Sequence, residues 1–212
     1  MTTSLFELFQ RGGPVMWPIL ICSITALAIA AERFFTLSRA EEESERAEEQ
    51  LTRALREHQM ARAEKICKQG GGPLARIARE GLRRYGRPRA EVLESMEEAG
   101  ALELPPLERR LPLLGTIAHL APLLGLLGTV TGLVRCFQTI QEKATSLNPV
   151  NPGDLAGGIW EALLTTVFGL IVAIPAYAMY NYLVYRVNTL TSRLEAAVIK
   201  LADLLSKQEA AE

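Results

Sequence analysis

The chain has 212 residues, of which 22% are charged, and its formal net charge is −1. This balance excludes a strongly basic nucleic-acid-binding protein, and the hydrophobic content of 49% excludes disorder over most of the chain. Three cysteines without paired spacing and two histidines exclude a disulfide framework and a cysteine- or histidine-built metal centre. We therefore expect no metal ion and no cofactor.

In residues 1–14, four apolar side chains surround Glu7 and precede Gln10: Leu5, Phe6, Leu8 and Phe9. This pattern is typical of a short amphipathic helix on the outer membrane face, and it fits a frayed terminus equally well.

Three segments without charged residues follow: 15–31 with 17 residues, and 111–134 and 162–185 with 24 residues each. Roughly 20 apolar residues in a helix cross the hydrocarbon core, and only helices or closed barrels satisfy their backbone there. The sequence therefore predicts three transmembrane helices in an all-α membrane protein.

The basic residues predict the orientation. Segment 32–110 carries 16 of the 23 lysines and arginines, whereas segment 135–161 carries two and the tail 186–212 carries four. The positive-inside rule places 32–110 and the tail in the cytoplasm, and 135–161 and the N-terminus outside.

Residues 15–31 end in a small-residue pattern like that of a cleaved signal peptide. Cleavage would export the basic block, so we interpret this span as an uncleaved anchor.

The cytoplasmic block 32–110 has a helical pattern. We expect one helix over 38–68, a break at Gly70–Pro73, a second helix over 74–85, and a third from Arg87. Pro105 and Pro106 are expected to interrupt the third helix before the second span. The glycine run lacks the lysine and hydroxyl residue of a phosphate-binding loop, so ATP is not the expected energy source, and we expect no enzyme activity.

Spans two and three each carry a stripe of small residues at alternating spacings of four and three. The stripes are Ala118, Pro122, Gly125, Thr129, Gly132, Cys136 and Ala162, Thr166, Gly169, Ala173, Ala176. Such a stripe lies on one helix face, which meets either another helix or a lumen. Packing inside the subunit alone would explain the glycines, but it explains less well why each stripe carries one threonine.

The two threonines lie at similar depth. Thr129 lies five residues before the end of span two, and Thr166 lies four residues after the start of span three. Both are therefore expected roughly 6–8 Å below the outer boundary, where they could share a polar layer. Alternatively, each hydroxyl bonds a carbonyl of its own helix.

Two titratable residues are also candidates for an ion pathway. Glu161 directly precedes span three, either as part of a pathway or as an exposed acid favoured by the helix dipole. His119 is the only imidazole inside a span, and a hydrogen-bonded structural role is the stronger reading. No Asp or Glu lies within the three charge-free segments, so the chain supplies no central proton carrier of its own.

Three motifs closely resemble the ExbB/TolQ proton-channel family, and more distantly MotA. They are residues 114–118, 121–132 and 161–176, together with Glu32-Arg33 after the first span. The resemblance covers roughly residues 10–195, and three spans rather than four favour ExbB/TolQ over MotA. The long motifs together are highly specific, whereas either stripe alone would be weak.

The resemblance implies a bacterial inner-membrane motor subunit that forms a homo-oligomeric, pentameric ring. The ring would surround helices of an ExbD/TolR-like single-span partner that carries an Asp, and would drive a TonB/TolA-like protein. Thr129 and Thr166 would line the ring interior, Glu161 its outer mouth, and Glu32 and Arg33 the inner boundary. We assign helix packing to Gly125, Gly128, Gly132, Gly169, Ala173 and Pro175. The sequence is compatible with a TonB-like, a Tol-like or another driven system, and with either H⁺ or Na⁺ as the transported ion.

A different class of function fits the same spans. A passive membrane scaffold would use the small stripes only to pack helices and to organise partner helices in the lipid.

Three prolines depart from the family pattern: Pro105, Pro106 and Pro112. They are expected to interrupt the extension of span two below the membrane.

Overall fold

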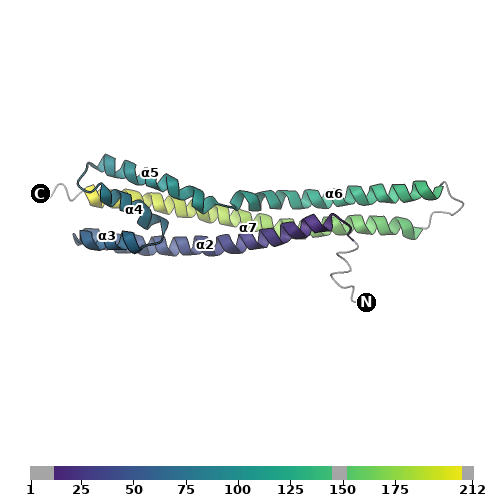
Figure 1. Cartoon of the computed structure of the whole chain (residues 1–212), viewed down its shortest axis with the longest axis horizontal. Helices are drawn as coiled ribbons and strands as arrows, with labels where there is room; N and C mark the ends of the chain where they lie inside the picture. Colours follow the sequence, from purple (N-terminus) through teal and green to yellow (C-terminus); the bar gives the residue numbers. More distant parts are fainter. Residues whose placement is uncertain (1–11, 145–151, 207–212) are drawn as a thin grey trace. The chain divides into compact units, whose positions relative to one another are not determined.

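The computed structural model describes residues 12–144 and 152–206, and all regular secondary structure in these ranges is α-helical. The helices, shown in Figure 1, are α2 (Met16–Arg56), α3 (Met60–Gln69), α4 (Pro73–Arg83), α5 (Arg89–Glu108), α6 (Leu111–Ala144) and α7 (Pro152–Ser206). The prediction of an amphipathic helix at the N-terminus concerns mainly residues 1–11, which lie outside the described ranges.

The described residues divide into two compact units, and each is described by itself. The first unit holds residues 12–31, 110–144 and 152–181, which are the first part of α2, all of α6 and the first part of α7. It contains the three predicted spans, and each lies in a helix long and apolar enough to cross a membrane. The prediction of three transmembrane helices is therefore consistent with the length and composition of these helices.

Bulky side chains in this unit point outward while small ones pack inside. Leu27, Phe137 and Ile174 are 74%, 68% and 67% exposed, whereas Ala121, Ala162 and Ala173 are buried. A water-soluble fold would hide such large apolar side chains, but lipid covers them without penalty.

The second unit holds residues 32–109 and 182–206, and it contains α3, α4 and α5 with the later parts of α2 and α7. Its core is formed by side chains from four helices: Leu51, Ile77, Met96, Leu201 and Leu205. Gly81 of α4 lies directly against Met96 and Leu205, so α4 approaches α5 and α7 at close range.

Ion pairs join α2 and α7 along the second unit. Arg186 and Arg193 both pair with Glu41, Arg193 also pairs with Glu45, and Lys200 pairs with Glu48. The three cations of this ion-pair seam are seven residues apart, which is two helical turns, so they lie on one face of α7. These charges therefore pair across the contact between α2 and α7.

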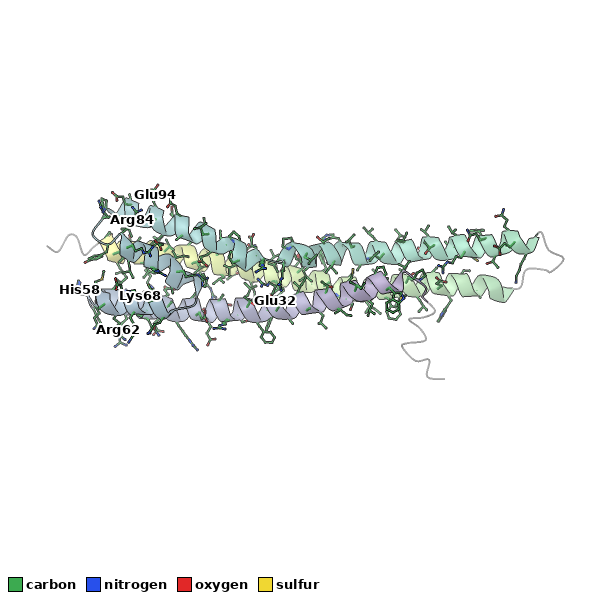
Figure 2. The ribbon with its side chains drawn as sticks, in the orientation of Figure 1. Glu32, His58, Arg62, Lys68, Arg84 and Glu94 are labelled. Carbon is green, nitrogen blue, oxygen red and sulfur yellow. The ribbon has the colours of Figure 1, made fainter. Side chains whose placement is uncertain are left out.

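The predicted single helix over residues 38–68 is wrong. The structure ends α2 at Arg56 and begins α3 at Met60, with a tight turn at residues 57–59. His58, labelled in Figure 2, has a φ of 56°, in the left-handed region that no helix interior allows. The expected break at Gly70–Gly72 is present, and Pro73 begins α4.

The predicted interruption at Pro105 and Pro106 is also wrong. Helix α5 continues through both prolines to Glu108, and the chain turns at Arg110, whose φ is 68°. The two prolines remove the amide bonds to the carbonyls of Ala101 and Leu102, and both of these residues are exposed. Pro112 is the second residue of α6, where a missing amide hydrogen costs little because the first turn has no intrahelical acceptor for it.

Candidate functional site

The small stripes of spans two and three face each other inside the first unit. A Cβ atom added to Gly125 would lie 3.0 Å from the Cα of Thr166, and one added to Gly132 would lie 2.9 Å from the Cβ of Ala162. At Gly169 the nearest atom is the Ala121 carbonyl oxygen, at 2.7 Å. Backbone atoms of α6 and α7 therefore meet without intervening side chains, as in small-residue packing of membrane helices.

The two predicted pathway threonines are bonded differently. The hydroxyl of Thr166 donates across the helix pair to the Gly125 carbonyl oxygen at 3.1 Å, whereas that of Thr129 donates within its own helix to Leu126 at 2.6 Å. Both residues are partly exposed. Gly128, next to Thr129 in the chain, contacts Thr165, so the hydroxyls of Thr129, Thr165 and Thr166 fall within about one helical turn of each other.

Thr165 is the member of this layer that the sequence argument missed. It is 1% exposed, and its hydroxyl donates to the Ala162 carbonyl oxygen at 2.8 Å. A Cβ on Gly128 would meet its side chain at 2.1 Å. Steps of three and four residues both keep one helix face, so either Thr165 or Thr166 can lie between Ala162 and Gly169 in the stripe. Spacing alone therefore does not decide which of the two threonines faces α6.

Glu161 lies one turn before Thr165 on α7, and it is held in an ion pair. Its Oε1 accepts a hydrogen bond from Nη1 of Arg135 at 2.5 Å. The backbone of Gly13, in the turn before α2, lies against the same carboxylate. A polar cluster formed by three chain segments thus lies close to the threonine layer.

His119 and Pro175 lie away from the contact between the small stripes. Nδ1 of His119 lies 2.7 Å from the carbonyl oxygen of Gly115, and its ring meets Tyr177 edge-to-face at 5.8 Å. The side chain is exposed on this unit. Pro175 is also exposed and lines a small apolar pocket with α2 residues such as Ala26, whereas Ala173 is buried.

Glu32 and Arg33 lie in the second unit, on α2, where Glu32 is labelled in Figure 2. Arg33 is 5% exposed, pairs with Glu32 at 2.9 Å and donates to the Pro106 carbonyl oxygen at 3.2 Å. A buried guanidinium beside the last turn of α5 satisfies a carbonyl that the ending helix leaves without a partner.

Metal ligands do not gather in the described part of the chain. Across residues 12–144 and 152–206, no group of three or more His, Cys, Asp or Glu side chains is placed to hold a metal ion. The threonine layer itself presents hydroxyls and backbone carbonyls, with one ion-paired carboxylate a turn away.

Comparison with known proteins places these features in a family. The model of the MotA/TolQ/ExbB proton channel family matches residues 69–196, which include α6 and most of α7. A Synechocystis sp. protein named ExbB-like 3 is 35% identical over 172 residues, which are 81% of each chain. The biopolymer transport protein ExbB of Aquifex aeolicus is 40% identical over 108 residues, 51% of this chain and 70% of its own length.

A Tol-Pal protein is also similar. TolQ of Haemophilus influenzae is 36% identical over 118 residues, 55% of this chain and half of its own length. The family model spans more than half of the chain and includes Thr129, Glu161 and Thr166, the residues that carried the resemblance. The chain belongs to the MotA/TolQ/ExbB proton channel family.

Proposed function

We propose that the protein is an ion-driven motor subunit of the ExbB/TolQ type in the bacterial inner membrane. Several copies, five by family likeness, form a ring around helices of an ExbD/TolR-like partner whose Asp carries the ion. The ring transfers the energy of ion flow to a TonB- or TolA-like protein and so to the outer membrane. The N-terminus lies in the periplasm and the C-terminus in the cytoplasm.

The single observation that supports this proposal is the hydroxyl layer inside an apolar helix pair. Thr129, Thr165 and Thr166 lie within one turn of each other, and Glu161 lies one turn earlier on α7. The charge-free spans supply no carboxylate at this level, so a partner's Asp would complete the layer. Thr129 and Thr166 keep partial exposure, so their side chains, unlike that of Thr165, are accessible to a partner helix.

The passive scaffold is the second candidate, and the glycine contacts favour it. Gly125, Gly132 and Gly169 are explained fully by close packing of α6 on α7, without any lumen. The two functions therefore differ in what they require of the threonine hydroxyls rather than of the glycines.

Replacing the exposed hydroxyls tests this difference. Thr129→Val and Thr166→Val keep the branched shape and remove only the hydrogen-bonding group. If the hydroxyls contact the partner's carboxylate during transfer, losing one removes about 1.5–3 kcal/mol, or roughly a ten- to hundredfold loss in rate. The measurement is ion flux through the purified complex with its partner in liposomes, with H⁺ and Na⁺ gradients compared.

Two matched variants separate transfer from packing. Thr116→Val removes a hydroxyl that donates to Pro112 at 2.8 Å in the same helix, and it should leave the flux unchanged. Thr165→Val removes a fully buried hydroxyl and should lower thermal stability more than flux. Full flux in both Thr129→Val and Thr166→Val would contradict the motor assignment of these residues and favour the scaffold.

The orientation has its own test. In a variant without native cysteines, a cysteine at Gln138 should react with a membrane-impermeant maleimide added to intact cells with permeabilised outer membranes. A cysteine at Gln50 should react only after the inner membrane is opened. Both positions are exposed in the structure, so failure to label reflects the membrane rather than burial. The opposite pattern would reverse the proposed topology.

A further inference from the structure

We infer that Arg135 is a positioning residue for Glu161, and that Arg135, Glu161 and the Gly13 backbone form a carboxylate latch. This inference rests on the proposed function, because it assigns to the latch the task of fixing Glu161 for ion transfer. It adds two residues, Arg135 and Gly13, to the ion pathway that the sequence motifs indicate.

The carboxylate latch is tight around one oxygen of the carboxylate. Nη1 of Arg135 lies 2.5 Å from Oε1 of Glu161, and the two side chains are 49% and 21% exposed. On Gly13, which has a φ of 70°, an added Cβ would lie 2.0 Å from that same oxygen and 3.4 Å from the Arg135 Nη1. A side chain there would be strained by the positive φ and would have to displace the carboxylate, so glycine suits this position.

Three chain segments therefore meet at one oxygen atom. Arg135 belongs to α6, Glu161 to α7, and Gly13 to the turn that leads into α2. The Gly13 carbonyl accepts the amide of Met16 at 3.2 Å, so the turn is joined to the start of α2. Arg135 and Glu161 are 26 residues apart, so their pairing depends on the close packing of α6 on α7.

The chemistry of the pair points to positioning rather than to stability. An ion pair whose cation is half-exposed contributes modestly to folding, because water competes with Glu161 for the guanidinium. Its effect on the carboxylate is one of orientation, since a charge-assisted hydrogen bond from a planar guanidinium fixes the direction of the oxygen that accepts it. A cation that enters the pathway meets a carboxylate that Arg135 holds in one orientation. The cation then replaces Arg135 as the partner of Glu161.

The decisive variant is Arg135→Gln, which keeps a hydrogen-bond donor but removes the charge. Partner-dependent ion flux should fall about tenfold, while Arg135→Lys, which restores a cation, should retain most of it. Gly13→Ala should give a similar loss by displacing the carboxylate. Arg53→Gln is the matched control, because it breaks an exposed pair with Glu57 far along the chain and should leave the flux unchanged.

Two readouts separate positioning from a structural role. In the Glu161→Gln background, Arg135→Gln should have no further effect on flux, because it acts through the missing carboxylate. The melting temperature of the assembly should stay within the range of the Arg53→Gln control. Additive losses of flux, or a large fall in melting temperature, would overturn the inference.

A third readout does not depend on flux. Carbodiimides label carboxyl groups that the reagent can reach, and in the carboxylate latch the Arg135 guanidinium and the Gly13 backbone cover one oxygen of Glu161. Mass spectrometry of the modified peptide should therefore show faster labelling of Glu161 in Arg135→Gln than in the unmodified protein. Equal labelling would overturn the carboxylate latch, whereas absence of flux in the unmodified complex would overturn the proposed function and leave the labelling result valid.

Discussion

Leucine at position 169 should force α6 and α7 apart and prevent stable assembly. The atoms that a side chain at Gly169 would meet are the Ala121 carbonyl oxygen at 2.7 Å and the Gly125 Cα at 3.2 Å. Both are backbone atoms, so no rotamer change relieves the clash. Overpacking of this kind costs about 1–3 kcal/mol in well-packed cores, and we expect at least that here. Native mass spectrometry and thermal denaturation in detergent should show an oligomer for the unmodified protein and its loss in the variant.

The matched control is Gly157→Leu on the same helix. A Cβ at Gly157 meets no atom within 4 Å, so leucine there adds the same volume without a clash in the subunit. Stable rings of Gly169→Leu would show that α6 and α7 can separate freely. A stable monomer of the unmodified protein would contradict the proposed ring itself.

Removing Arg186 should destabilise the second unit more than removing any other cation of the ion-pair seam. Its guanidinium pairs with Glu41, donates to the Ser38 hydroxyl at 2.9 Å, and lies 5.7 Å and 5.9 Å from the ring centroids of Phe34 and Tyr182. Because only 19% of the side chain is exposed, water replaces few of these contacts. Arg186→Ala should lower the free energy of unfolding by roughly 2–3 kcal/mol.

The pH dependence of this stabilisation has a definite sign. The hydrogen bond with Glu41 raises the pKa of Arg186 above its ordinary value. A cation whose pKa is raised by folding contributes its full stabilisation below its unfolded pKa and loses it only as the pH rises through the folded value. The difference between Arg186→Ala and the unmodified protein should therefore not diminish between neutral and mildly alkaline pH.

Arg46→Ala provides the comparison for Arg186. Arg46 pairs with Glu42 one turn away on α2, and the two side chains are 69% and 62% exposed. Its removal should change the free energy of unfolding by less than about 1 kcal/mol. Equal effects of the two alanine variants in chemical denaturation would show that the ion-pair seam does not hold α2 against α7.

The three long apolar helices and the glycine break were predictable because their signals are local. Charge-free length identifies a span without knowledge of its neighbours, and the run Gly70–Gly72 before Pro73 marks a helix boundary by itself. The turn at His58 carries neither glycine nor proline. Its only local signal is that histidine tolerates positive φ better than most residues. At Pro105 and Pro106 the helix continues because the residues of the preceding turn are exposed, so water can bond the carbonyls that the prolines leave without an amide partner. In a buried helix the same two prolines would break the helix.

The candidate site was only partly predictable, for a physical reason. Thr129, Thr166 and Glu161 were found from motif and spacing within single helices. Thr165 and Arg135 become part of the site only through the packing of α6 on α7, which brings residue 165 to Gly128 and residue 135 to residue 161. Periodicity assigns residues to a face, but it does not give the rotation of one helix against another.

The approach of Gly132 and Gly158 has a consequence for motion. A Cβ on Gly132 would lie 2.9 Å from the Gly158 carbonyl oxygen, and one on Gly158 would lie 3.2 Å from that of Gly132. The hydrogen that replaces each Cβ therefore points at the other residue's carbonyl, which forms a reciprocal pair of Cα–H···O contacts. No rotamer enters such a contact, so thermal repacking of side chains cannot loosen it. Helices α6 and α7 should consequently move as one rigid body near these glycines, and any conformational step in this unit should displace α2 against that body.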